Sequence, residues 1–429
     1  MKKHIIGILL FNFSIIGVAQ IKYNHIAFIN GIAHIGNGSI IESSLIVINK
    51  DLIETVTSTK GLKLNYKSFD TVIDIQGKHV YPGLINTNNI LGLHDAEAVR
   101  ATRDYSEIGN INPHIRSLIA YNTDNLIVPT VKTNGILYTQ ATPREGLISG
   151  SSSIMALEGW NWEDAVLKAD DGIHLNYPKM NYKKWSEEDG LTNSSNKKYT
   201  QELNYLSRFF EDAKFYCNET LHAEKNIRFE AMRNVFNGQS TLYIHLDKAK
   251  DILSAINFIN QHKIKYPVIV GGKESYKISK ELKKNSIPVM LNRINDLPDN
   301  ADEDIDIVYR LPYLLQKDSV LFCLQLEGDM EAMLSRNLPF NAGAAVAYGL
   351  SKEEALASIS LNAAKILRIE SLIGSLEVGK KASLVISSGD ILDIKTNQVE
   401  MAFISGKRVD LINKQTELYI KYKTKYGIK

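Results

Sequence analysis

The segment from Ser240 to His262, STLYIHLDKAKDILSAINFINQH, decides the fold class. Its first eight residues contain a short run of β-prone apolar side chains, which is typical of a buried strand. Apolar side chains then recur at helical spacing, namely Ile252, Ala255, Ile256 and Ile259. This spacing predicts an amphipathic helix. A buried strand followed directly by a helix is the repeating unit of α/β proteins.

The same unit recurs further along the chain. YPVIVGG precedes the helical ESYKISKELKKNS, IPVML is another strand, and VLFCLQL precedes the helical LPFNAGAAVAYG. The following helix, in SKEEALASISLNAAKIL, begins with Ser351 and Glu354 at capping-box spacing. This many alternating units predict a parallel sheet that is either closed into a barrel or doubly wound.

The two ends of the chain show a different sequence pattern. Short apolar or alternating runs separated by turn formers extend from Ile21 to about His79, and similar runs return in ASLVISSGD and VEMAFISGKRVDL. They predict one small β-sandwich completed by both ends of the chain. The polar segment 182–199 predicts a surface loop, QELNYLSRFFEDAKFY a helix, and the final LYIKYKTKYGIK a solvated helix.

The N-terminus predicts export. Lysines at the start are followed by an apolar run from Ile5 to Ala19 that ends in small residues, which is the layout of a signal peptide. The run is shorter than the roughly 20 residues of a membrane span. We therefore expect a periplasmic or secreted protein with no membrane attachment after cleavage. The two cysteines, Cys217 and Cys323, allow a disulfide, but the apolar run around Cys323 favours a buried thiol.

Charge gives no indication of a nucleic-acid partner. Fifty basic and 48 acidic side chains leave a formal net charge of only +2. Without a field of one sign, the protein is not expected to attract nucleic acid or to steer charged substrates. Partners have to be inferred from sites.

Four segments resemble the amidohydrolase superfamily, in particular its imidazolonepropionase-like branch. VYPGLINTNN, at 80–89, is similar to the PGLID-x-H-x-H signature that opens the barrel, and YIHLDKAKDI to the HAHRADDI motif. TNGILYTQATPREGLISGSSSIMAL resembles a glycine-rich segment whose loop of small residues lines the active-site mouth. LPFNAGAAVAYGLSKEEALASISLNAAKILRIESLIGSLEVGKKASLVI resembles the C-terminal signature.

The resemblance implies an α/β fold, a (β/α)₈ TIM-like barrel with a small composite β-sandwich domain built from both chain ends. The expected division is a signal peptide at 1–19, sandwich parts at 20–80 and 370–412, the barrel at 81–369, and a basic tail at 413–429. The implied activity is hydrolysis of an amide or cyclic C–N bond by a water bound to zinc or a similar ion. An aspartate at the end of strand eight would take the proton.

The ligand positions differ from that pattern. By resemblance, the two histidines after the first strand fall on Asn88 and Ile90, and the acid before them on Asn86. The strand-five histidine is kept as His245, whereas the second histidine of HAHR is Asp247. On strand six the segment 270–272, Val-Gly-Gly, carries no histidine.

On strand eight Glu327 stands where the aspartate would be, with Asp329 two residues on. A catalytic zinc site needs about three protein ligands. We therefore expect no metal cofactor and a protein that is weakly active or non-catalytic. It would act as a homo-oligomer or as a partner subunit of an intact relative.

Two other functions remain open. An active hydrolase could use a remodelled site with His245 and Glu327 as catalytic residues, binding zinc with the help of His94. The alternative for His94 is that LHDAEAVRATRDY begins an ordinary helix with a charged face. A periplasmic protein that binds a small-molecule ligand is the third function.

Five residues are candidates for a substrate pocket. They are Arg144, Ser149, Ser151, Asn88 and Trp160. Arg144 could pair with an acid of the ligand, and Trp160 could line the pocket mouth or cover the flank of the barrel. GSSSI does not match the Gly-x-Ser-x-Gly nucleophile elbow, so a serine nucleophile is not indicated.

Overall fold

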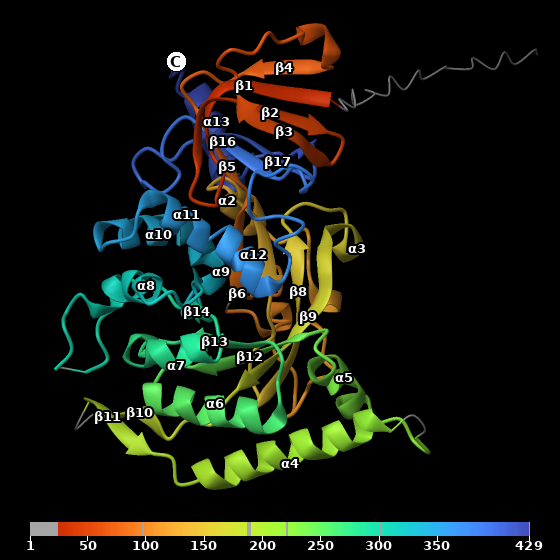
Figure 1. The fold of residues 1–429 in the computed structure, drawn as a ribbon, viewed down its shortest axis with the longest axis vertical. Coiled ribbons are helices and arrows are strands. Elements are labelled where there is room, and N and C mark those ends of the chain that lie inside the picture. Colours follow the sequence, from red (N-terminus) through yellow and green to blue (C-terminus); the bar gives the residue numbers. More distant parts are fainter. Residues whose placement is uncertain (1–24, 97, 187–189, 220–221, 301, 429) are drawn as a thin grey trace, which may run out of the picture.

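An eight-stranded sheet that nearly closes on itself forms the centre of the molecule (Figure 1). The computed structural model describes residues 25–96, 98–186, 190–219, 222–300 and 302–428. The strands follow the order β15-β14-β13-β12-β9-β8-β7-β6. Their bounds are β6 Leu84–Asn89, β7 Ile136–Ala141, β8 Ile148–Ala156, β9 Val166–Asn176, β12 Thr241–Leu246, β13 Pro267–Gly271, β14 Val289–Leu291 and β15 Phe322–Leu324. A parallel bridge between Thr87 and Gln325 joins the first and last strands. The α/β, TIM-like barrel expected from the sequence is therefore confirmed.

The barrel departs from strict strand–helix alternation at β8. This strand pairs antiparallel with both β7 and β9. Residues 142–147 connect β7 to β8, and so short a connection cannot hold the crossover of a dozen or more residues that parallel strands require. The expectation of a loop in ISGSSSIMA was wrong, because this stretch is the fully buried strand β8.

Helices cover the outside of the barrel. The larger ones are α4 Tyr199–Asn218, α5 Ile227–Phe236, α6 Ala249–His262, α7 Ser279–Lys284, α8 Ile307–Lys317, α10 Leu338–Ala347, α11 Lys352–Ser358 and α12 Leu361–Leu367. In α6 the four residues predicted for the inner face are all buried. The capping box of Ser351 and Glu354 opens α11 as predicted.

A second sheet contains strands from both ends of the described chain, side by side in Figure 1. Its order is β18-β17-β16-β5-β1-β2-β3, with β4 paired to β1. The strands are β1 His25–His34, β2 Ile40–Asn49, β3 Leu52–Ser58, β4 Thr71–Asp74, β5 His79–Pro82, β16 Leu384–Ser387, β17 Val399–Ile404 and β18 Lys407–Arg408. The two ends are joined by the antiparallel pairing of β16 with β5 and by a bridge between Leu52 and Lys381. Phe28, Leu384 and Phe403 share its apolar core.

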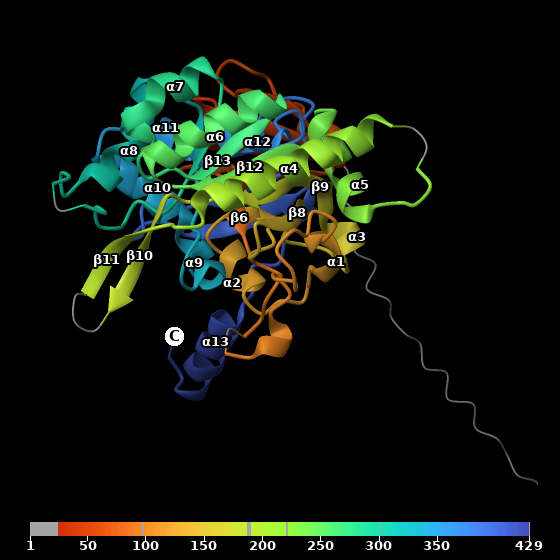
Figure 2. The same ribbon diagram turned by 90° about the horizontal axis from the view of Figure 1, so that it is seen from below.

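Short elements complete the chain. They are α1 Ser117–Ala120, α2 Val128–Lys132, α3 Trp162–Ala165, α9 Glu331–Leu334, and the 3-10 helices η1 Tyr66–Ser68, η2 Arg100–Thr102, η3 Ser275–Ile278 and η4 Ser335–Asn337. The last helix, α13 Lys414–Lys425, contacts α2 and buries none of its side chains, as expected for a solvated helix (Figure 2).

Two local expectations were wrong. Segment 182–199 contains the antiparallel hairpin of β10 Asn181–Ser186 and β11 Gly190–Ser195 instead of a loop. LHDAEAVRATRDY forms no α-helix in its described part, because His94 bridges antiparallel to Arg103 and the backbone turns back on itself.

Three further expectations concern thiols and membranes. Both cysteines are free, and Cys323 is buried as predicted. The predicted signal peptide lies outside the described residues. Within the part of the chain that is described, no helix has both the length and the apolarity to cross a bilayer.

Candidate functional site

Polar side chains from four barrel strands meet at the carboxyl ends of the parallel strands. Asn88 is the fifth residue of β6, Arg144 follows β7, His245 lies in β12 and Glu327 follows β15. In TIM-like barrels this end carries the active site. The structure therefore brings together four of the residues predicted from the sequence.

Arg144 lies at the centre of this group. Its Nη1 donates to Asn88 Oδ1 at 2.8 Å, and its Nη2 donates to the Asn88 carbonyl at 2.9 Å and to Glu331 Oε1 at 2.8 Å. The side chains of Arg144 and Glu331 are only 15% and 5% exposed. Burial acts to lower the pKa of Arg144, but Glu331 and Glu327 more than offset this effect and raise it. Arg144 is thus a buried, charged guanidinium whose acid partner belongs to the chain itself.

Glu327 is held as a carboxylate. Its Oε2 accepts from Asn88 Nδ2 at 2.8 Å and lies 3.7 Å from His245 Nδ1. Burial would raise the pKa of Glu327, but Arg144, His245 and Asn88 outweigh burial and hold it well below its ordinary value. An ionised Glu327 beside an imidazole is the geometry that a proton-transfer pair would have.

A buried network continues from Asn88 into the barrel. The Asn88 backbone N–H donates to Gln140 Oε1 at 2.9 Å, and Gln140 Nε2 donates to Ser152 and Asp171. Ser152 and Tyr243 also donate to the Asp171 carboxylate, at 2.7 and 2.6 Å. Burial raises the pKa of Asp171, while the hydrogen bonds from Tyr243 and Ser152 counteract it.

His174 links this network back to His245. Its Nε2 is 2.9 Å from Ser152 Oγ and its Nδ1 is 2.9 Å from His245 Nε2. Burial, followed by the charges of His245 and Arg144, lowers the pKa of His174 well below 6.5, so the ring is neutral at pH 7. Since Ser152 donates to Asp171, it accepts from His174 Nε2–H, and His174 Nδ1 then accepts from His245. His245 Nε2 is therefore assigned a proton.

The positions next to this network offer few side chains that could bind a metal. Ile90 packs its side chain against an apolar cluster, and its backbone N–H donates to Glu331. A Cβ on Gly271 would lie 2.5 Å from Asp247 Oδ1, and its φ of +100° disfavours any side chain. Asp247 itself is 3.9 Å from Lys179 Nζ, and burial raises its pKa. In the described part of the chain, no group of three or more His, Cys, Asp or Glu side chains is arranged to hold a metal ion.

The other predicted residues lie apart from Arg144 and Glu327. Ser149 accepts from Asn176, and Ser151 donates to the Ile115 carbonyl and to Asp170. His94 is buried, packs edge-on against Tyr105 and accepts through its carbonyl from Asn125. Since β8 runs antiparallel, Trp160 follows it at the opposite end of the barrel, where the side chain is 93% exposed.

Several members of the network were not predicted from the sequence. They are Glu331, His174, Gln140, Asp171 and Tyr243. A histidine within the apolar-polar run DDGIHLNY is a signal that could have drawn attention to His174. Glu331 has no such signal, because it becomes part of the site only when the turn after Glu327 folds back over the mouth.

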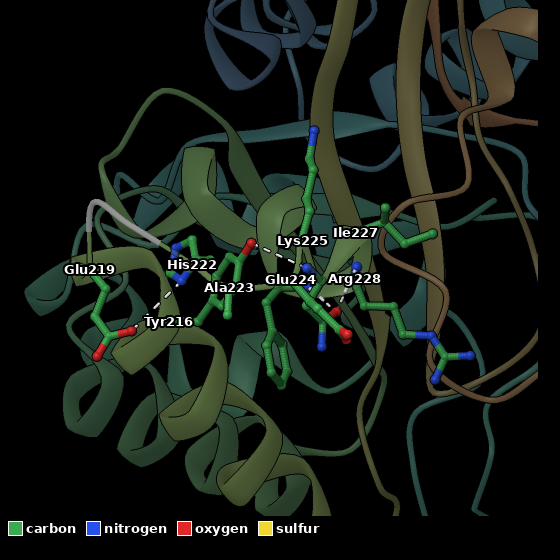
Figure 3. Close-up of a pocket in the computed structure, with 10 residues that line it drawn as sticks. Tyr216, Glu219, His222, Ala223, Glu224, Lys225, Ile227 and Arg228 are labelled. Carbon is green, nitrogen blue, oxygen red and sulfur yellow. Dashed lines mark hydrogen bonds and ion pairs between the residues drawn. The ribbon is translucent and has the colours of Figure 1, made fainter.

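A separate open pocket of about 620 Å³ lies between α4 and α5 (Figure 3). Tyr216 and His222 stack in it with ring centroids 3.6 Å apart, and His222 is 3.7 Å from Glu219. None of its lining residues comes from a barrel strand. The pocket is therefore distinct from the network at the barrel mouth.

The family model described as "Amidohydrolase family" matches residues 184–409. Among solved structures, an amidohydrolase from Thermotoga maritima MSB8 is 22% identical, with a TM-score of 0.77, and the alignment covers 90% of this chain and 99% of that one. No curated protein matches.

More distant structures are also similar. A Xaa-Pro dipeptidase with bound methionine is 14% identical with a TM-score of 0.55, covering 90% of this chain and 100% of that one. An ochratoxinase from A. niger is 14% identical with a TM-score of 0.54, covering 90% and 96%. At these identities the likeness concerns the fold.

Proposed function

The chain belongs to the amidohydrolase family, and from that premise we propose that it is a member of the imidazolonepropionase-like branch that does not carry out metal-dependent hydrolysis. The observation that carries this proposal is the orientation of the Asn88 amide. Its N–H group faces Glu327 at 2.8 Å, where the resemblance places a metal-binding histidine. On this side, facing Glu327, the amide nitrogen offers no lone pair, so it cannot act as a metal ligand there.

The remaining donor set does not fit a catalytic zinc ion either. Ile90 has no donor atom, and Gly271 has no side chain. With a proton on His245 Nε2, that nitrogen offers no lone pair, which leaves at most Nδ1 of this ring as a ligand. A zinc site needs about three protein ligands with one open position. We therefore derive no catalytic step through a metal.

The rest of the molecule fits a scaffold role. We propose that the two-ended sheet is the composite β-domain of the family, with the boundaries expected from the sequence. We further propose that the chain is exported and assembles with itself or with an intact relative. The retained barrel supports assembly with an intact relative, since a subunit can keep the fold of its family without keeping the catalytic activity.

A hydrolase assay tests the proposal. Since similar structures include a dipeptidase and an ochratoxinase, the panel contains X-Pro dipeptides, N-acyl amino acids and cyclic amides. We expect no turnover above the buffer blank, and no effect of added Zn²⁺ or of a chelator. Turnover that Zn²⁺ raises and a chelator abolishes would overturn the proposal.

One second candidate is supported by a specific observation. The ionised Glu327 lies 3.7 Å from His245, as in an acid–base pair that works without metal. In that case turnover would be insensitive to chelator, and Glu327→Gln would lower it by about 10² to 10⁴. The matched control is Glu417→Gln on α13, which would leave turnover unchanged.

A further inference from the structure

Arg144 is surrounded by oxygen atoms at the barrel mouth. We infer that its guanidinium is the resident cation of this mouth, and that the oxygens it binds form a latent site for a hard divalent cation such as Mn²⁺. This inference rests on the proposal that the native barrel holds no catalytic metal. The inference also explains why the acidic side chains at the mouth are stable without a bound metal ion.

Two acidic side chains share one cation at the barrel mouth. Glu331 lies 2.8 Å from the guanidinium, and Glu327 acts on the same group through its charge. The Glu331 side chain is 5% exposed and the Glu327 side chain 29% exposed, and a carboxylate with so little access to water is stable only beside a cation or a set of hydrogen-bond donors. Arg144 supplies one positive charge to two acids, which is less than a divalent ion would supply.

The atoms around the guanidinium are of the kind that hard cations bind. The terminal nitrogens of Arg144 contact Asn88 Oδ1, the Asn88 carbonyl and Glu331 Oε1. All three are oxygens at 2.8 to 2.9 Å. Asn88 has a left-handed φ of +48°, which asparagine adopts more readily than most residues, and it presents both of its oxygens to one group. Carboxylate and carbonyl oxygens are the ligands that Mg²⁺, Ca²⁺ and Mn²⁺ prefer.

These atoms differ from the ligand set of the family pattern. Glu331 and the Asn88 carbonyl have no counterpart among the histidines of the resemblance. Without the guanidinium, one carboxylate and two carbonyl-type oxygens would surround the vacated volume, with Glu327 adjacent. The Asn88 amide, which turns its N–H toward Glu327, turns its oxygen toward this volume.

The test is Mn²⁺ binding by electron paramagnetic resonance. We expect Arg144→Ala to bind about one Mn²⁺ per chain, at least about tenfold more tightly than the native protein. Arg144→Lys keeps the positive charge and should bind no better than the native protein. Arg144→Ala with Glu331→Gln should lose the gain, because a neutral amide replaces the carboxylate ligand.

Arg116→Ala is the matched control. Arg116 also pairs with a carboxylate, Asp170, at 2.7 Å, but its side chain is 41% exposed. Its removal should not create Mn²⁺ binding. If Arg144→Ala does not fold, Arg144→Gln keeps most of the volume without the charge, and Mn²⁺ should raise its melting temperature.

The outcomes separate the two proposals. Metal bound tightly by the native protein would refute the proposed function. A metal-free native protein, with no Mn²⁺ bound by either Arg144→Ala or Arg144→Gln, would refute the latent site and leave the proposed function standing. Equal gains in Arg144→Ala and Arg144→Lys would refute the charge role of Arg144.

Discussion

Arg144 Nη2 lies 2.8 Å from Glu331 Oε1, and both side chains are buried at the mouth of the barrel. The two residues are 187 positions apart in the sequence. Their pairing joins the turn after β7 to the first turn of α9, so the ends of the first, second and last barrel strands are fixed to one another around Asn88.

Glu331→Gln should destabilise the fold by roughly 2 to 3 kcal/mol, because it removes the nearest charge partner of a buried guanidinium. Urea unfolding followed by circular dichroism measures this change. Glu417→Gln, in an ion pair whose two side chains are 76% and 59% exposed, should change stability by less than about 0.5 kcal/mol. Equal effects of the two variants would show that the buried pair contributes little.

Gly271→Ala should lower the free energy of unfolding by roughly 2 to 4 kcal/mol. The new Cβ would lie 2.5 Å from Asp247 Oδ1 and 2.8 Å from the Leu246 carbonyl, in a left-handed conformation. Gly379 has a similar φ of +87°, but a Cβ added there would have no atom within 4 Å, so Gly379→Ala serves as the control. Comparing the thermal denaturation of both variants separates the effect of the steric clash from that of the left-handed backbone. A Gly271→Ala variant as stable as Gly379→Ala would contradict the prediction.

Tyr243→Phe should destabilise the protein by about 1 to 3 kcal/mol, because it removes a donor from the buried Asp171 carboxylate. Tyr205 is 53% exposed, and Tyr205→Phe should be nearly neutral. Chemical denaturation at pH 7 compares the two. A neutral Tyr243→Phe would mean that Asp171 does not depend on the tyrosine hydroxyl.

His174 should make stability depend on pH. Its folded pKa lies below the ordinary 6.5, so protons bind the unfolded chain preferentially once the pH falls below that value. Stability is therefore complete above pH 6.5 and declines as the pH falls toward the folded pKa, by up to about 1.4 kcal/mol per pH unit.

His174→Gln should flatten this decline. Urea unfolding at several values between pH 5 and pH 8 gives the slope for each protein. Since the other histidines are common to both, the difference between the slopes belongs to His174. Parallel slopes would show that His174 takes up its proton as readily in the folded as in the unfolded state.

Local patterns predicted much of the fold. The helical spacing in α6 and the capping box of α11 depend on neighbouring residues, and both were correct. The antiparallel β8 was missed because small and polar residues in ISGSSSIMA suggest a loop. In the barrel these residues are buried, and Ser152 is satisfied by hydrogen bonds to residues on other strands.

The candidate site was predictable only where a motif marked the position. Asn88, His245 and Glu327 stand at recognisable places, and Arg144 was expected to pair with an acid. The acid proved to be Glu331 of the same chain, 187 residues away, and no local pattern indicates such a pairing. His174 was likewise missed because its role depends on its contact with His245 across adjacent strands.

The central claim is that the native barrel does not bind a catalytic metal. The most direct measurement is the metal content of the purified native protein, after expression with added zinc and manganese and removal of loosely bound ions. Elemental mass spectrometry should find well under about 0.1 metal ion per chain, since a site with a single available imidazole nitrogen lacks the roughly three ligands of a zinc centre. A stoichiometry near one, lost in His245→Ala, would contradict the account.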